Sequence, residues 1–120
     1  MATFYKDAEN HFLVALSSDA PAPEGYTALE ANTTDAAQEK HVPVVARKND
    51  GRLIHVTVGS TEHPMQDDHY IEWIALDAGD RLEMHALKPG QAPTVFFPGG
   101  VQSGTVYAYC NLHGFWKTGL

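Results

Sequence analysis

The chain has 120 residues, of which 43% are hydrophobic and 19% charged, and this composition is typical of a folded globular domain rather than a disordered segment. Its formal net charge of −7 disfavours nucleic acid and anionic membranes as partners, because both are bound through clustered Lys and Arg side chains. Its apolar runs are all shorter than the roughly 20 residues that span a bilayer.

Residues 1–33 are expected to form a small separate unit. The first ten residues contain no basic stretch followed by an apolar one, which argues against a secretory signal. Residues 4–5 and 11–16 predict two short strands around a polar turn. Residues 17–25 are rich in Pro and small residues and predict a linker. This unit has too few apolar residues for an independent core, so we expect it to pack on the main domain or on a second subunit.

From residue 34 onward the sequence predicts a mainly β structure. Residues 34–38 predict one helical turn, with Thr33 or Thr34 as its N-cap. Alternating apolar residues between turn signals predict strands at 42–46, 52–58, 69–76, 81–87, 93–97 and 105–110. Short strands at this spacing predict an all-β fold, an antiparallel sandwich of about seven strands. We assign four large side chains to its core: Ile71, Trp73, Phe96 and Tyr107.

The seven histidines separate into two groups. His55 and His85 alternate with apolar neighbours and are expected to face solvent, and His11 lies in the N-terminal hairpin, far from other candidate ligands. The other four lie mostly in loops or at the ends of elements, where a rigid β scaffold usually carries its sites: His41, His63, His69 and His113.

The only cysteine lies in the segment Cys110-Asn111-Leu112-His113-Gly114. A thiol and an imidazole at this spacing can both turn toward one metal ion, and the glycine allows the backbone to fold tightly around it. The pair alone is weak evidence, because Cys-x-x-His arises often by chance. Its combination with three further histidines in one small domain predicts a metal site. A single cysteine also excludes an internal disulfide and is compatible with a reducing compartment, so we expect a cytoplasmic location.

The set of donors limits the choice of metal. A structural zinc site normally closes with four ligands, one fewer than the five candidates here. A blue-copper site uses two histidines, one cysteine and usually a weak axial methionine, but no methionine follows His113. Four imidazoles and a thiolate suit five-coordinate iron with a sixth position open. A cupredoxin-like electron carrier and a non-catalytic β-sandwich binding module remain as alternatives.

Three segments, in this order, resemble the superoxide reductases of the desulfoferrodoxin and neelaredoxin family over residues 35–117. They are Glu39-Lys40-His41-Val42-Pro43, then His63-Pro64-Met65 with Asp68-His69-Tyr70-Ile71-Glu72-Trp73, and Tyr107-Ala108-Tyr109-Cys110-Asn111-Leu112-His113-Gly114. The resemblance implies an immunoglobulin-like sandwich with one mononuclear non-haem iron (Fe2+/Fe3+) per subunit. It implies Cys110 as the axial ligand and four equatorial histidines, with His113 binding through Nδ1 and the other three through Nε2: His41, His63 and His69.

The resemblance also implies the reaction, a one-electron reduction of superoxide to hydrogen peroxide. Rubredoxin or a similar small electron donor would then reduce the iron again. We expect Lys40 to attract the anionic substrate despite the negative net charge, and Glu39 to bind the ferric ion in the resting state. Backbone N–H groups of Leu112 and His113 are expected to hydrogen-bond the sulfur of Cys110. A homodimer or homotetramer is expected.

The N-terminal unit is similar to the first iron-binding knuckle of desulfoferrodoxin. Asp7 and Asn10 stand where that knuckle has its two cysteines, and the second cysteine pair has no counterpart. The chain therefore resembles the one-iron forms, with residues 1–33 as a metal-free remnant of the desulforedoxin-like domain and residues 34–120 as the iron-binding catalytic domain.

Overall fold

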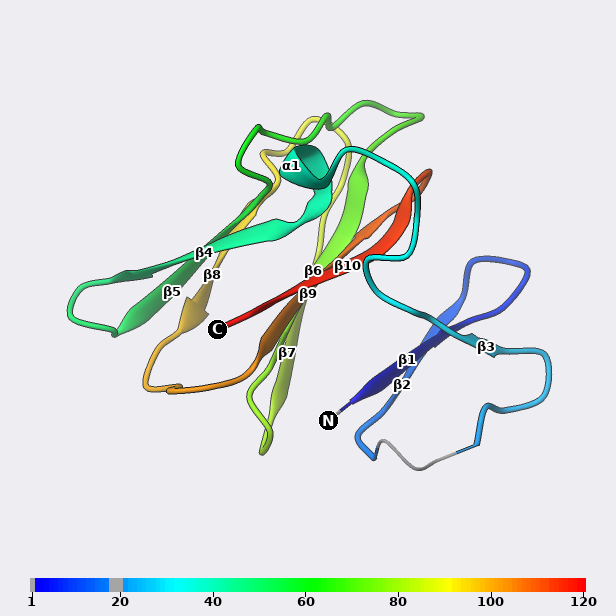
Figure 1. Ribbon diagram of the computed structural model, residues 1–120, viewed down its shortest axis with the longest axis horizontal. Coiled ribbons are helices and arrows are strands. Elements are labelled where there is room, and N and C mark those ends of the chain that lie inside the picture. Colours follow the sequence, from blue (N-terminus) through cyan, green and yellow to red (C-terminus); the bar gives the residue numbers. More distant parts are fainter. Residues whose placement is uncertain (1, 18–20) are drawn as a thin grey trace. The chain divides into compact units, whose positions relative to one another are not determined.

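The computed structural model describes residues 2–17 and 21–120 (Figure 1). The chain divides into two compact units, Met1–Glu30 and Ala31–Leu120. Among the described residues, the structure contains no helix of the length and apolar character needed to cross a membrane. The predicted linker at 17–25 lies partly outside the described residues, at 18–20.

The first unit is a small antiparallel sheet with the strand order β2-β1-β3, formed by β1 (Thr3–Lys6), β2 (Phe12–Ala15) and β3 (Thr27–Ala28). The two predicted strands are present, and β3 is an addition. Asp7 holds the turn between β1 and β2, because its Oδ1 accepts hydrogen bonds from the backbone N–H groups of Glu9 (2.9 Å) and His11 (2.8 Å). Asn10 completes this turn in the left-handed region, with φ of 65°.

The second unit is a sandwich of two antiparallel sheets, as predicted. Within residues 31–120, all of which are described, one sheet has the order β10-β9-β6-β7 and the other β4-β5-β8. The strands are β4 (Pro43–Lys48), β5 (Leu53–Val58), β6 (Ile71–Asp77), β7 (Leu82–Ala86), β8 (Thr94–Pro98), β9 (Thr105–Cys110) and β10 (Gly114–Gly119). The six predicted strands are thus present. The seventh strand, β10, lies in a segment bounded by glycines, for which the sequence analysis predicts no strand.

Alternate residues of both sheets form one core. The three-stranded sheet contributes Ile54, Val56, Val58, Val95 and Phe97, and the four-stranded sheet contributes Ile71, Ile74, Leu76, Val106, Ala108 and Cys110. Because Cys110 is the last residue of β9 and is fully buried, its sulfur lies at one end of this core.

The core assignments of Ile71, Trp73 and Tyr107 are confirmed, because all three are buried, and the core assignment of Phe96 was wrong. Phe96 is 51% exposed, because it pairs with His55 on the outer face of its sheet while its neighbour Phe97 points inward. Trp73 is buried, but not on the face of Ile71, because a β-bulge between the two changes the register with β9. The sequence alternation across residues 71–73 does not reveal this extra residue.

The two histidines predicted to face solvent differ in their surroundings. His55 lies on the outer face, where it stacks on Phe96 with ring centroids 4.5 Å apart. His85 is exposed, but it pairs with Ile74 and its ring centroid lies 5.1 Å from that of Phe97, so it borders the core at the edge strand β7.

The predicted helical turn lies about one turn later than expected. The helix α1 spans Gln38–His41, and its N-cap is Ala37, which makes no side-chain capping bond, rather than Thr33 or Thr34. Tertiary contact explains the shift, because the carbonyl of Glu39 within α1 accepts a hydrogen bond from the backbone N–H of Thr61 (2.9 Å), far along the chain.

Candidate metal centre

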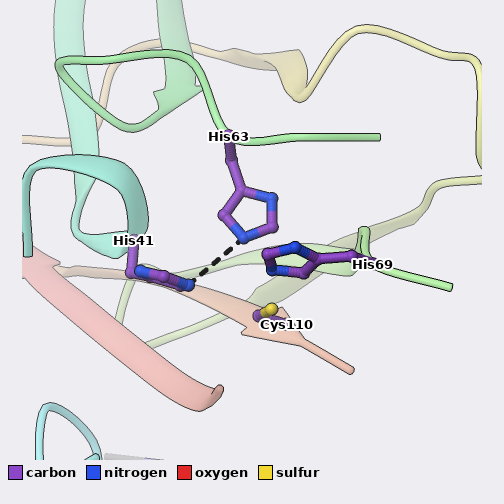
Figure 2. A group of neighbouring side chains, drawn as sticks. All are labelled: His41, His63, His69 and Cys110. Atoms are coloured by element: carbon purple, nitrogen blue, oxygen red, sulfur yellow. Dashed lines mark hydrogen bonds between the residues drawn. The ribbon is translucent and has the colours of Figure 1, made fainter. Parts of the chain in front are cut away.

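Four side chains from separate parts of the second unit converge at one end of the sandwich (Figure 2). His41 ends α1, His63 follows β5, His69 precedes β6 and Cys110 ends β9. Their potential ligand atoms all lie within 4.8 Å of one another. His113, in the turn between β9 and β10, joins them, because its Nδ1 lies 3.1 Å from Nε2 of His41 and 3.9 Å from Sγ of Cys110. The structure thus brings together all five residues expected to bind the metal.

The four imidazoles form a closed ring in the order His41, His63, His69, His113. Centroids of neighbouring rings are 4.7, 4.7, 5.1 and 4.9 Å apart in that order, with interplanar angles of 75°, 81°, 74° and 84°. The centroids of His41 and His69 are 6.5 Å apart and their planes differ by 30°, so these two rings lie across from each other.

The spacing of the nitrogens fits one metal ion at the centre of this ring. Nε2 of His41 lies 3.2 Å from Nε2 of His63 and 3.1 Å from Nδ1 of His113. Two nitrogens bound at right angles to one ion, each at about 2.1 Å from it, would be about 3.0 Å apart. Nε2 of His69 is buried and has no hydrogen-bond partner in the described part of the chain, as expected for a nitrogen that binds a metal ion. Four imidazoles with one sulfur are a suitable donor set for a transition metal such as iron.

Backbone carbonyls determine which nitrogen of two rings carries the proton. Nδ1–H of His41 donates to the carbonyl of Ala37 and Nδ1–H of His63 donates to the carbonyl of Pro64, both at 2.7 Å. Since a carbonyl oxygen can only accept, Nε2 of each ring presents its lone pair to the centre. His113 directs Nδ1 toward His41 instead. These are the nitrogens that the family resemblance implies as ligands.

The electrostatics of the site favour neutral imidazoles. Burial lowers the pKa of His63 to about 4, and burial also lowers the pKa values of His41 and His69. For His41 and His69 the positive charge of Lys40 contributes to the lowering. These three rings are therefore neutral at pH 7 and ready to bind a cation, for which a histidine must have lost its proton.

Burial has the opposite effect on the thiol, because it raises the pKa of Cys110. Hydrogen bonds from the backbone N–H groups of His113 and Leu112 to the sulfur oppose that rise. These are the two donors expected from the sequence. The thiol is thus poised to become a thiolate when a cation is bound beside it.

A close backbone contact positions α1 and therefore His41. The carbonyl of Glu39 accepts hydrogen bonds from the backbone N–H of Thr61 (2.9 Å) and from the hydroxyl of Ser60 (3.2 Å). A Cβ added at Gly59 would lie 2.6 Å from that carbonyl oxygen, so glycine is needed there. The same loop continues directly to His63 and links two of the four imidazoles.

The tight turn after Cys110 depends on Gly114, whose φ is +79°. Behind it, Trp116 is fully buried, donates through Nε1–H to the carbonyl of His113 (3.0 Å) and stacks on His41 with centroids 4.9 Å apart. The sequence analysis assigns no role to Trp116, although the aromatic pair Phe115-Trp116 directly after Gly114 could have indicated packing behind the site.

Lys40 and Glu39 are both exposed on α1 next to the imidazole ring. The positive charge of Lys40 makes a small contribution to the lowered pKa values of His41 and His69, after burial and the neighbouring histidines.

Comparison with known proteins identifies relatives of this chain. A desulfoferrodoxin from Clostridium acetobutylicum is 58% identical over 92 residues, which cover 77% of this chain and 71% of that relative. A superoxide reductase from Pyrococcus horikoshii is 34% identical over 96 residues, which cover 66% of this chain and 84% of the relative.

The solved structures give a similar result over a longer range. The crystal structure of the superoxide reductase from Treponema pallidum aligns with a TM-score of 0.78 and 33% identity, over 98% of both chains, so the alignment includes the N-terminal unit. The desulfoferrodoxin family model matches residues 33–119, which contain all five converging side chains. The chain therefore belongs to the desulfoferrodoxin family.

Proposed function

We propose that the protein is a superoxide reductase that converts superoxide to hydrogen peroxide at one mononuclear non-haem iron. The ligands would be His41, His63, His69, His113 and Cys110. The observation that carries this proposal is the closed ring of four imidazoles beside a buried thiol, with nitrogen spacings suited to one ion. The similarity to proteins named superoxide reductase supports the choice of reaction.

Superoxide needs one electron and two protons to become hydrogen peroxide. Bound iron would supply the electron by cycling between Fe2+ and Fe3+, with an external donor restoring the ferrous form. The protein keeps three of the imidazoles neutral through burial and holds the thiol of Cys110 against two backbone N–H groups. These contacts fix the ligands and moderate the charge on the sulfur.

Lys40 would attract the substrate and Glu39 would act after the product has left. A protein with a formal charge of −7 repels anions, but an exposed ammonium beside the imidazole ring gives a local positive potential. We assign to Lys40 a second role, orienting the water that donates protons. We assign to Glu39, exposed on the same turn, the role of holding the oxidised ion in the resting state.

The proposal includes partners and organisation. The donor would be rubredoxin or a similar small carrier, and the protein would be a cytoplasmic homodimer or homotetramer. Residues 1–33 would be a metal-free remnant, supported by Asp7, whose carboxylate accepts backbone hydrogen bonds within the turn that resembles a metal-binding knuckle. The single cysteine supports a reducing compartment.

Metal analysis together with an absorption spectrum tests the proposal. We expect one iron per chain and a thiolate-to-ferric charge-transfer band that disappears on reduction and in Cys110→Ser. Superoxide consumption should yield hydrogen peroxide without oxygen, and should require a reductant for repeated turnover. A chain that binds zinc, copper or no metal would contradict the proposal.

The main alternative is a cupredoxin-like electron carrier. Such a carrier would bind copper through only two histidines, whereas here all four imidazoles lie in one closed ring. Single alanine variants of the four histidines distinguish the two, since loss of metal from all four supports iron and loss from only two supports copper.

A further inference from the structure

We propose that Asn111 is a positioning residue that fixes His69 within the metal centre. This inference rests on the proposed function and adds a residue that is not itself a ligand. Asn111 lies between Cys110 and His113, and its side chain turns away from that pair toward the loop that carries His69.

The contacts of Asn111 bracket His69 on both sides. Oδ1 of Asn111 accepts a hydrogen bond from the backbone N–H of Tyr70 (2.9 Å), and Nδ2–H donates to the carbonyl of Asp68 (3.1 Å). The backbone N–H of Asn111 donates to the carbonyl of Tyr70 (3.2 Å). Three hydrogen bonds thus join the residues before and after His69 to the turn that holds Cys110 and His113.

His69 is held differently from two of the other imidazoles. His41 and His63 are buried and are oriented by a carbonyl at Nδ1, whereas His69 is only partly buried and its backbone pairs with Gln66 of its own loop. The link to Asn111 is long-range, since it connects residues 41 and 43 positions apart. It therefore couples the His69 loop to the turn that carries Cys110 and His113.

An amide at this position is chemically specific. It must accept with one atom and donate with the other, and asparagine does both with a short side chain. Asn111→Asp keeps the acceptor for Tyr70 but turns the donor into an oxygen that faces the carbonyl of Asp68. Asn111→Ala removes both bonds. Because loss of a partner that orients a metal ligand typically weakens binding about 10- to 100-fold, we expect a large change in iron retention.

Asn32 provides a matched control. Its Oδ1 accepts from the backbone N–H of Lys117 (2.9 Å), its Nδ2–H donates to the carbonyl of Lys117 (3.3 Å) and its own N–H donates to the carbonyl of Phe115. Like Asn111, Asn32 accepts through Oδ1, donates through Nδ2 and donates through its backbone N–H, although both of its side-chain bonds go to one residue. Neither Lys117 nor Phe115 is next in sequence to a proposed ligand. Asn32→Asp therefore makes the same chemical change away from His69.

The experiment measures iron loss from the iron-loaded chain to an excess of chelator, and the rise in melting temperature that iron produces. Asn111→Asp and Asn111→Ala should lose iron about 10 to 100 times faster than the original chain and gain less stability from iron, whereas Asn32→Asp should match the original chain.

Two results would overturn the inference. One is that Asn111→Asp retains iron as well as the original chain, and the other is that Asn32→Asp loses iron as fast as Asn111→Asp. Each leaves the proposed function intact. An original chain that takes up no iron would instead overturn the proposed function, and this inference with it.

Discussion

The metal-free protein should lose stability as the pH falls from 6.5 toward 4, because of His63. This side chain is 2% exposed, and burial lowers its pKa from 6.5 to about 4. Below pH 6.5 the unfolded chain binds a proton that the folded chain does not, so the free energy of unfolding decreases with falling pH and is level above 6.5. The gap between the two pKa values corresponds to about 3 kcal/mol at pH 4. The lowered pKa values of His41 and His69 act in the same direction.

Urea unfolding of the metal-free chain, followed by tryptophan fluorescence from about pH 7.5 down to about pH 4, measures this loss. His63→Gln replaces the imidazole with an amide that does not titrate, so its stability should depend less steeply on pH even if its absolute stability is lower. If His63→Gln retained the full slope, the buried neutral imidazole would not be the source of the acid sensitivity.

Three further predictions concern the substrate path, the helix α1 and the core. Lys40→Ala should slow superoxide consumption about tenfold at low salt and flatten its salt dependence without changing the absorption spectrum. Lys48→Ala makes the same change in net charge at the far end of β4 and should leave the rate of superoxide consumption unchanged. An unchanged rate in Lys40→Ala would remove Lys40 from the mechanism. Gly59→Ala should destabilise the chain by about 1–3 kcal/mol in urea unfolding, because its Cβ would meet a carbonyl of α1 at 2.6 Å, and an unchanged midpoint would show that the loop can move away. Phe97→Ala should cost about 3–5 kcal/mol in the same assay and Phe96→Ala much less, and equal losses would contradict the inward and outward assignment.

The strands were predictable where hydrophobic alternation is regular. Ile54, Val56 and Val58 alternate along β5, and all three are fully buried. The alternation failed at residues 71–73, because a β-bulge adds a residue that only the pairing with β9 reveals. It also failed at β10, since Gly114 and Gly119 at its ends are weak strand formers and the strand is fixed by pairing with β9.

The helix α1 could not be placed correctly from local signals. The threonines at 33 and 34 are good N-cap residues, but the structure uses Ala37, which forms no side-chain cap. The position of the turn follows instead from contacts with residues far along the chain, including the hydrogen bonds that Thr61 and Ser60 make to the carbonyl of Glu39. A single-turn helix has little intrinsic stability, so such contacts decide where it forms.

The candidate site shows a similar division between residue identity and geometry. The sequence could indicate which histidines meet, because His41, His63, His69 and His113 lie near element ends around one cysteine. It could not indicate which nitrogen of each ring faces the centre from residue type alone, since that depends on the carbonyls of Ala37 and Pro64 and on the tight turn at Gly114.

The support of each ring also predicts how the site would fail. His41 and His63 are buried and oriented by carbonyls within their own segments, so a change elsewhere should leave their Nε2 atoms in place. His69 depends instead on hydrogen bonds between its loop and Asn111, so its nitrogen should be displaced more easily than those of His41 and His63. Loosening of the metal centre should therefore begin at the His69 loop, and hydrogen exchange at the backbone N–H of Tyr70, which donates to Asn111, should report it before exchange at residues of α1.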